Sequence, residues 1–378
     1  MKTALTLPAL LLTAACAAGS ASVDGGPDPA GVVYDVWVTS ESADEIARVR
    51  FGPEGARVVQ RRDVGSMPVE IDGPHGVAVA PDGEHIYVTI GHGVPYGSLW
   101  KIEAETGEVV ARTLLGLFPA TVSVTPDGEY AFVSNFNLHG DPVASSISKV
   151  HLGTMAEVAR IQTCVMPHGS RINPQGTLHY SVCMMDQMLV EIDVGTGGIA
   201  RSFSVARGME GPAGDRGPIA QTTHDTEPGT ALCNPTWAEP SADGSSVFVT
   251  CNAAAEVIEI DVDEWRVVRR FDTGEAPYNL ATTPDGRYLL VSLRNRSDPA
   301  LEVYDLTNGR QAARIPASTT LVHGIAVSPD SRYAFVTAEG VGSEPGKVDV
   351  IDLRALRRVA SVEVAQQATG IAIAPSTR

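Results

Sequence analysis

Short apolar runs alternate with polar turns along almost the whole chain, which is the pattern of an all-β protein. One phrase shows the pattern in full. An apolar run, Val77–Ala80, leads into the turn Pro81-Asp82-Gly83, and a second run, Ile86–Thr89, follows. Asp-Gly between two such runs predicts a β-hairpin. The phrase recurs in degraded copies, so the sequence is a series of repeats.

The copies align on the proline of this turn, which one copy replaces with alanine. The aligned residues are Pro81, Pro126, Pro174, Ala242, Pro284, Pro329 and Pro375. Successive copies lie 45, 48, 68, 42, 45 and 46 residues apart. Each copy carries the pattern of four short strands. A period of about 40–50 residues with four strands per repeat is the signature of a β-propeller blade.

The two ends of the chain predict the number of blades. The N-terminal part offers a second strand at Val36–Thr39, then a third and a fourth, with no first strand before them. The C-terminal part offers a lone first strand at Gly370–Ala374. Pairing the two would complete a blade and remove two free sheet edges. The sequence therefore predicts an all-β, seven-bladed propeller of four-stranded antiparallel blades, with the ring closed by the terminal strands.

The second strands of the repeats carry a recurring motif, as in Tyr87-Val88-Thr89, Phe132-Val133-Ser134 and Phe248-Val249-Thr250. These phrases resemble the YVTN-repeat family of seven-bladed propellers, which are bacterial secreted or surface proteins. The resemblance covers nearly all of the chain after its N-terminal segment and implies the fold. Related propellers include sugar-lactone hydrolases, haem d1 domains and copper oxidoreductases, so the fold does not define a function.

Composition agrees with a turn-rich β protein and excludes some partners. The 378 residues include 37 Gly and 25 Pro, and only 19% are charged. The net charge of −17 argues against nucleic acid as a partner, because binding phosphates needs a basic surface. No central segment is apolar enough to span a membrane. We expect a monomer whose partner is a small molecule or a metal ion.

The N-terminus has the pattern of an export signal. Lys2 supplies the charge, Leu5–Leu12 form the apolar run, and small residues follow. Leu11–Cys16 resembles a lipoprotein box, although Thr13 stands where leucine is usual. We predict a signal peptide at 1–16 with lipidation of Cys16, a tether at 17–31 and the propeller at 32–378. The alternative is ordinary cleavage near residue 18 or 21. Both place the protein in the periplasm or cell envelope, and any membrane contact would be through the lipid.

The remaining four cysteines predict two disulfides. Cys164 and Cys183 flank the first hairpin of one blade, and Cys233 and Cys251 flank that of the next. An antiparallel hairpin brings the start of its first strand near the end of its second. In an oxidising compartment the expected bonds are therefore Cys164–Cys183 and Cys233–Cys251, both within blades. The alternative is that Cys183 binds a metal, since three methionines, Met184 among them, follow it.

Histidines recur at one position of the repeat, the middle of the triplet that opens each first strand. In chain order this position holds His75, Ala120, His168, Thr236, Tyr278, His323 and Thr369. With nine histidines in 378 residues, seven random positions would carry about 0.2. First strands line the central channel of a propeller, so these triplets are expected at the mouth of the channel.

Further histidines are expected on the same face. His92 and His139 lie in the loops that join second to third strands of two neighbouring blades. His224 lies in the long insertion, residues 207–232, which accounts for the 68-residue step and is predicted to overhang the mouth as a lid. The other three histidines, in predicted strands, are expected to be structural.

Neutral imidazoles that converge on a channel mouth suit a transition metal. We predict a site with ligands His75, His168, His323, His92 and His139, with copper favoured and zinc or haem as the other candidates. Further candidates at the mouth are His224, Cys183, Met184, Glu239, Tyr278 and Arg294, together with Arg171, Trp237 and Asn279. Such a protein could also be redox-active.

Two alternatives remain open from the sequence. Each His-Gly pair could be a polar turn element in a scaffold propeller without a metal. A lactonase-type hydrolase is also possible, but it would need carboxylates around a divalent ion, and Glu239 is the one clear acidic candidate. The chain has no Gly-x-Ser-x-Gly elbow, phosphate loop or Cys-x-x-Cys-His haem attachment. No catalytic residue is therefore predicted.

Overall fold

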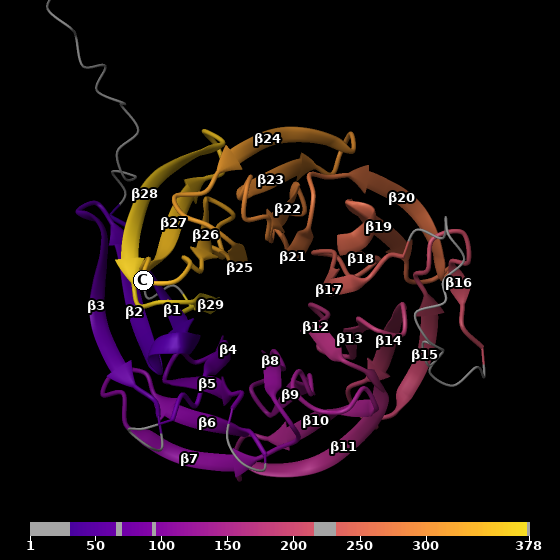
Figure 1. Ribbon diagram of the computed structural model, residues 1–378, viewed down its shortest axis with the longest axis horizontal. Helices are drawn as coiled ribbons and strands as arrows, with labels where there is room; N and C mark the ends of the chain where they lie inside the picture. The colour runs from indigo at the N-terminus through magenta and orange to yellow at the C-terminus, as the bar shows by residue number, and fades with distance from the viewer. Residues whose placement is uncertain (1–30, 66–69, 93–95, 215–231, 376–378) are drawn as a thin grey trace, which may run out of the picture.

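The computed structural model describes residues 31–65, 70–92, 96–214 and 232–375, which form a ring of blades (Figure 1). In these residues the strands form seven antiparallel sheets, six with four strands and one with five. The predicted seven-bladed propeller is confirmed. The predicted signal peptide, Cys16 and the tether up to residue 30 lie outside the described residues.

Each blade has a first strand at the centre of the ring and a second, third and fourth strand further out. The first strands are β4 (Pro74–Val79), β8 (Pro119–Val124), β12 (Pro167–Ile172), β17 (Pro235–Pro240), β21 (Pro277–Thr282), β25 (Val322–Val327) and β29 (Ala368–Ile373). The second strands are β1 (Tyr34–Ser40), β5 (His85–Ile90), β9 (Tyr130–Asn135), β13 (Leu178–Cys183), β18 (Ser246–Cys251), β22 (Tyr288–Leu293) and β26 (Tyr333–Ala338).

The outer half of each blade follows the same order. The third strands are β2 (Glu45–Gly52), β6 (Ser98–Glu103), β10 (Ala144–His151), β14 (Met188–Asp193), β19 (Glu256–Asp261), β23 (Ala300–Asp305) and β27 (Gly346–Asp352). The fourth strands are β3 (Gly55–Asp63), β7 (Val109–Leu114), β11 (Ala156–Val165), β15 (Ile199–Ser204), β20 (Arg266–Asp272), β24 (Arg310–Pro316) and β28 (Arg357–Val364). The fifth strand of one sheet is β16 (Gly211–Pro212).

Two short 3-10 turns, η1 (Glu41–Ala43) and η2 (Asn252–Ala254), each follow a second strand and lead into a third. No helix in the described part of the chain is long and apolar enough to cross a membrane.

The core lies between neighbouring blades, not within one sheet. One apolar cluster joins Tyr87 and Leu99 of one blade to Val133 and Val150 of the next. Second and third strands are therefore covered on both faces and read as continuous apolar runs. Fourth strands have one face in solvent, and β7 alternates between more and less exposed residues.

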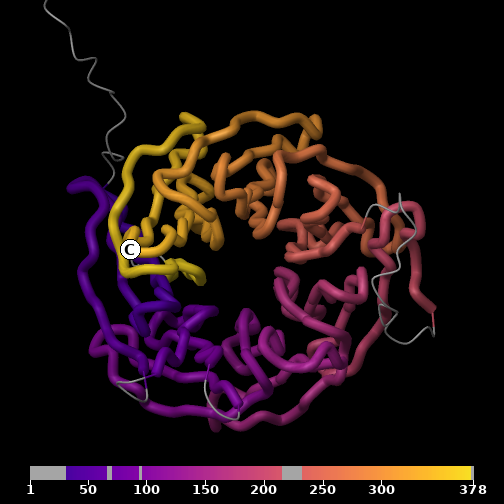
Figure 2. The backbone as a smooth tube through the Cα atoms, viewed as in Figure 1, coloured from indigo at the N-terminus to yellow at the C-terminus, as the bar shows by residue number. Residues whose placement is uncertain are grey.

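The termini close the ring as predicted. Strand β29 pairs antiparallel with β1 in the register Val36↔Ile373, Trp37↔Ala372 and Val38↔Ile371. Figure 2 shows the last strand of the chain inserted beside the first at the inner edge of that blade. The seventh blade is thus built from both ends of the chain, and it leaves neither β1 nor β29 as a free edge.

The recurring hydroxyl of the second strands ties each blade to the next. In five blades this Thr or Ser accepts a hydrogen bond from a backbone N–H of its own first strand. In the same five blades the hydroxyl donates to the backbone carbonyl at the middle of the next blade's triplet. One buried hydroxyl therefore satisfies a donor and an acceptor on two blades and fixes the spacing of the triplets.

Replacing Thr337 by Val should destabilise the protein by about 1–3 kcal/mol, because the change keeps the shape but leaves buried backbone groups without partners. Thr337 accepts from the Gly324 N–H at 2.7 Å and donates to the Thr369 carbonyl at 2.8 Å. Equilibrium denaturation would measure the loss. Thr337→Ser, which keeps the hydroxyl, is the control and should lose clearly less. Equal stabilities for Thr337→Val and wild type would show that this link does not contribute.

Both predicted disulfides are present, Cys164–Cys183 and Cys233–Cys251. The prediction that both lie within blades was wrong for the first pair. Cys164 belongs to β11, which extends as far as Val165, so this bond joins the outer strand of one blade to the second strand of the next. Two disulfides indicate an oxidising environment, as expected of an exported protein.

Candidate functional site at the mouth of the central channel

The chain enters all seven first strands through a residue with positive φ, just before each triplet. These residues are Gly73, Phe118, Met166, Asn234, Ala276, Leu321 and Gln367. Six of the seven are not glycine, although the left-handed region costs such residues roughly 1 kcal/mol or more. The repeated conformation turns the chain sharply into the channel, so that the middle residues of the triplets come together at one end of it.

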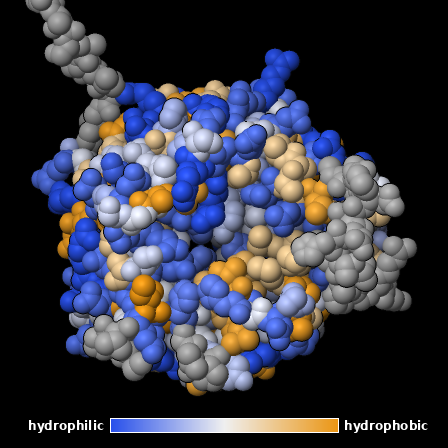
Figure 3. All heavy atoms as spheres, viewed as in Figure 1, coloured by the Kyte–Doolittle hydropathy of each residue, from blue (hydrophilic) through white to orange (hydrophobic). Residues whose placement is uncertain are grey.

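Three histidines from different blades meet there, as the sequence predicts. The ring centroids of His75 and His323 are 5.4 Å apart, and those of His75 and His168 are 6.4 Å apart. All three side chains are buried. His75 and His323 both line a small cavity at the mouth of about 30 Å³, which is the space of one water molecule or one ion. We call it the upper cavity, since the mouth is taken as the top of the channel. The space-filling view shows a hollow at the centre of the ring (Figure 3).

His75 is held by Glu41, a residue that the sequence analysis missed. The Nδ1 of His75 lies 2.8 Å from Oε2 of Glu41, and the Nε2 of His92 lies 3.4 Å from the other carboxylate oxygen. Burial alone would raise the pKa of Glu41, but the two imidazoles hold it well below its usual range. Since Nδ1 of His75 faces a carboxylate, its buried Nε2 is the ring nitrogen left for another partner, and this atom has no hydrogen-bond partner in the described protein.

His168 is fixed in one tautomer by its neighbours. Its Nδ1 lies 2.9 Å from the Thr236 carbonyl and must donate to it. Its Nε2 is therefore the acceptor, and the Tyr278 hydroxyl donates to it at 3.2 Å. Burial lowers the pKa of His168 to about 3, so the ring is neutral at neutral pH. Burial also lowers the pKa of His323, whose Nδ1 is buried without a partner in the described residues.

Arg294 reaches the same end of the channel and pairs with Glu339, the second residue that sequence analysis missed. Its Nε and one terminal nitrogen lie 2.7 and 3.1 Å from the two carboxylate oxygens. The Arg294 guanidinium also lies 5.3 Å from the centroid of the Tyr278 ring. Burial is the main influence on Glu339 and raises its pKa despite the arginine. The mouth thus combines imidazoles, of which burial lowers the pKa of His168 and His323, with a phenol and two buried carboxylates that already have partners.

His92 and His139 lie beside the mouth and not in the central histidine group. Their rings stack with centroids 5.3 Å apart, and Phe118 packs against both. His92 is partly buried and its pKa is raised, mainly by the hydrogen bond to Glu41. His139 is exposed. Together with Leu117 and Phe118 they line a groove of about 470 Å³.

Three of the other candidates already have partners of their own. Cys183 is bonded to Cys164 and so offers no thiolate to a metal, while Met184 packs against an apolar cluster around Phe118. Glu239 lies further down the channel, where it pairs with Arg171. Its predicted position at the mouth does not hold, because it is three residues beyond the triplet centre and a strand rises about 3.3 Å per residue.

The predicted lid is described only at its start. Strand β16 pairs with β15, so this part of the insertion extends a sheet at the outer edge of the ring (Figure 1). Glu210 forms an ion pair with Arg270 of the next blade. His224 and the rest of the insertion, 215–231, lie outside the described residues, and the lid stays a prediction.

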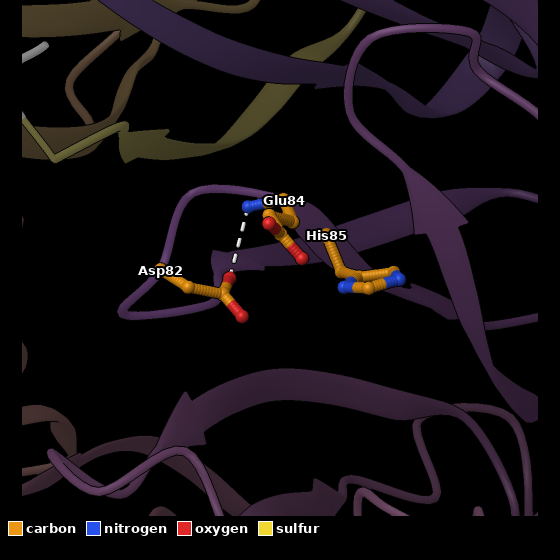
Figure 4. Close-up of side chains that lie close together, drawn as sticks. All are labelled: Asp82, Glu84 and His85. Carbon is orange, nitrogen blue, oxygen red and sulfur yellow. Dashed lines mark hydrogen bonds between the residues drawn. The ribbon is translucent and has the colours of Figure 1, made fainter.

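One compact group of potential metal ligands lies away from the mouth. Among the described residues, Asp82, Glu84 and His85 are the set of three whose ligand atoms all lie within 4.8 Å of one another (Figure 4). Asp82 and Glu84 are exposed, and Asp82 accepts a hydrogen bond from the Glu84 backbone, as expected of an Asp-Gly turn. Turn geometry accounts for this group. The ligand atoms of the three mouth histidines do not all lie within 4.8 Å of one another, so an ion held by all three would require their rings to move closer together.

His179 should make the protein sensitive to acid. It is fully buried against Phe132, and neither ring nitrogen has a partner in the described protein. Burial lowers its pKa to about 3, against an ordinary value of 6.5. Below pH 6.5 the unfolded chain takes up a proton there that the folded protein does not. The free energy of unfolding should therefore fall by about 1.4 kcal/mol per pH unit from this residue as pH drops from 6.5 towards 3.

His179→Leu should remove this contribution of His179 to the pH dependence of the free energy of unfolding. Denaturation of both proteins with chelator at pH 7.5, 6.0, 5.0 and 4.5 would test it, since other groups titrate alike in the two. We expect nearly equal or higher stability for the variant at pH 7.5, and an advantage that grows as the pH falls. Parallel stability curves would mean that His179 is protonated or solvated in the folded protein.

Comparisons with known proteins show the fold. No protein-family model matches the sequence, and no curated protein matches it. Among solved structures, Kuenenia stuttgartiensis hydrazine synthase is similar at 21% identity and a TM-score of 0.62, over 82% of this chain and 92% of that chain. A protein of unknown function from Desulfotomaculum acetoxidans DSM 771 is similar at 15% identity and a TM-score of 0.66, over 91% and 99%. At these identities the likeness shows a shared propeller fold and nothing about activity.

Proposed function

We propose that this protein is an exported propeller that binds one transition-metal ion at the mouth of its channel, through His75, His168 and His323. The observation that carries the proposal is a pair of buried imidazole nitrogens, Nε2 of His75 and Nδ1 of His323, that lack partners beside one ion-sized cavity. Leaving such atoms unpaired costs roughly 1–3 kcal/mol each, which a metal bond would offset.

The surroundings of the histidines support the proposal. Metal-bound histidine commonly donates its other ring N–H to a carboxylate or a backbone carbonyl, which orients the ring. Here the Glu41 carboxylate is the acceptor for Nδ1 of His75, and the Thr236 carbonyl is the acceptor for Nδ1 of His168. Tyr278 would release Nε2 of His168 and could itself supply an oxygen ligand. Nitrogen ligands with an oxygen favour copper, with zinc next. A redox role, lipidation at Cys16 and membership of the YVTN-repeat family are part of the same proposal.

Copper titration of metal-stripped protein tests the proposal. We expect calorimetry to show one ion per chain. The electron paramagnetic resonance spectrum of the Cu(II) form should show coupling to nitrogen ligands. His75→Ala, His168→Ala and His323→Ala should each weaken binding at least tenfold, and Glu41→Gln should weaken it by roughly 10–100-fold through His75. Unfolding curves would confirm that each variant is folded.

His85→Ala is the matched control, because it removes a histidine from the Asp82–Glu84–His85 turn instead. If that variant loses the ion while His168→Ala keeps it, binding belongs to the turn. If all variants bind as wild type does, the protein is a propeller without a metal at its mouth.

A further inference from the structure

Below the histidines, the channel widens into a second cavity of about 320 Å³ that reaches the opposite, turn-bearing face at Pro284. Most of its wall is aliphatic and comes from the first strands of several blades. The apolar lining includes Val79, Val124, Ile172, Ala281, Val327 and Ile373. Arg171 and Glu239 are the charged residues in this lining among those described. A volume of about ten waters, with mostly aliphatic walls and one pair of charged residues, suits a small amphipathic molecule.

Arg171 is poorly compensated for an enclosed cation. Its Nε lies 3.4 Å from Oε2 of Glu239, which is an ion pair without a hydrogen bond. Its Nη1 donates to the Ser170 carbonyl at 3.0 Å, and its guanidinium stacks over the Trp237 ring at 4.6 Å. The Arg171 side chain is 28% accessible. Because Arg171 lines both cavities, its accessible part faces the channel. Guanidinium forks of this kind bind carboxylates with two parallel hydrogen bonds.

A second unused donor lies beside it. The indole Nε1 of Trp237 is buried without a partner in the described residues, and Trp237 lines the upper cavity that Arg171 shares. Glu239 is held through its other oxygen by the backbone N–H and hydroxyl of Thr282. Arg171 and Trp237 thus have donor groups to spare. The nearby carboxylate of Glu239 is hydrogen-bonded to Thr282 and not to Arg171.

We propose that the lower channel is a binding site for a short-chain aliphatic monocarboxylate, whose carboxylate pairs with Arg171 and whose chain packs on the valine and isoleucine wall. The site is independent of the metal proposed at the mouth. Glu239 competes with the ligand for the guanidinium.

The charge on Glu239 sets the direction of the pH dependence. Burial raises the pKa of Glu239 to about 7, in spite of Arg171. Below that pH the competing carboxylate is neutral, so the ligand should bind more tightly as pH falls from 8 to 6. The other titratable groups near Arg171 are His179, whose pKa Arg171 helps to lower, and His75 and His323 of the upper cavity.

Calorimetry with sodium hexanoate, on chelator-treated protein, tests the proposal, and 1-hexanol serves as the neutral probe of the same length. We expect saturable binding of one hexanoate per chain and at least tenfold weaker binding of hexanol. Arg171→Met should weaken hexanoate at least tenfold, and Glu239→Gln should tighten it and flatten its pH dependence. Glu41→Gln, whose side chain contacts His75 and His92 and lines neither cavity, should bind hexanoate as wild type does, which separates this site from the metal.

Equal binding of hexanoate and hexanol, unchanged binding by Arg171→Met, or no binding at millimolar hexanoate would overturn the proposal. If Arg171→Met does not fold, Glu239→Gln decides alone, because weaker or unchanged binding in that variant contradicts competition for Arg171.

Discussion

A chain that ends at Gln367 should fail to form a stable ring. The truncation removes β29, whose Ala368 and Ile371 belong to a buried cluster. It also removes the backbone pairing with β1 and the hydrogen bond from the Gly370 N–H to the Thr39 hydroxyl at 2.8 Å. The net stability of a folded protein is only about 5–15 kcal/mol, so loss of a whole inner strand should consume most of it.

Thermal and chemical unfolding of the truncated protein, with both disulfides formed, would measure this effect. We expect no cooperative transition, or a greatly lowered midpoint. A chain that ends at Pro375 keeps all of β29 and is the control. A synthetic peptide of residues 366–375 should restore part of the stability in trans, because it can refill the vacant strand position. A truncated protein that unfolds like the control would show that a seventh blade of three strands, β1–β3, closes the ring without β29.

The fold could be predicted because its signals are local and repeated. The Asp-Gly turns and the strand pattern recur with a period close to the size of a blade, and the incomplete repeats at the two ends imply that they complete each other. The crossing of Cys164–Cys183 between blades was not predictable in this way. It depends on β11 extending to Val165, and sequence patterns do not define strand ends to one or two residues.

The site was half predictable for a similar reason. Comparing the triplets in register identified His75, His168 and His323. Glu41 and Glu339 were missed, although each stands two residues after the hydroxyl of its second strand, at Thr39 and Thr337. Arg294 holds the same position after Ser292. Comparison of that position across the copies would have pointed to all three. The pairing of these residues, by contrast, depends on how neighbouring blades pack and has no signature in the sequence.

Loss of either disulfide should cost about 3 kcal/mol, since each closes a loop of under 20 residues whose freedom in the unfolded chain the bond restricts. The Cys164–Cys183 bond ties two blades together, and the Cys233–Cys251 bond anchors the chain where it returns from the insertion. The two bonds share no residues, so their effects should nearly add. Removal of both should therefore cost about 6 kcal/mol, a large part of the expected net stability.

Three variants test this, Cys164→Ala with Cys183→Ala, Cys233→Ala with Cys251→Ala, and all four changes together. Paired substitution avoids a free thiol that could exchange with the remaining bond. Equilibrium denaturation should place the two double variants well below wild type and the fourfold variant lowest. The first pair should also make the interface between β11 and β13 open more readily, seen as faster amide exchange there than in the second pair. If the double variants unfold within about 0.5 kcal/mol of wild type, the packed blades already restrict the ends that the bonds join.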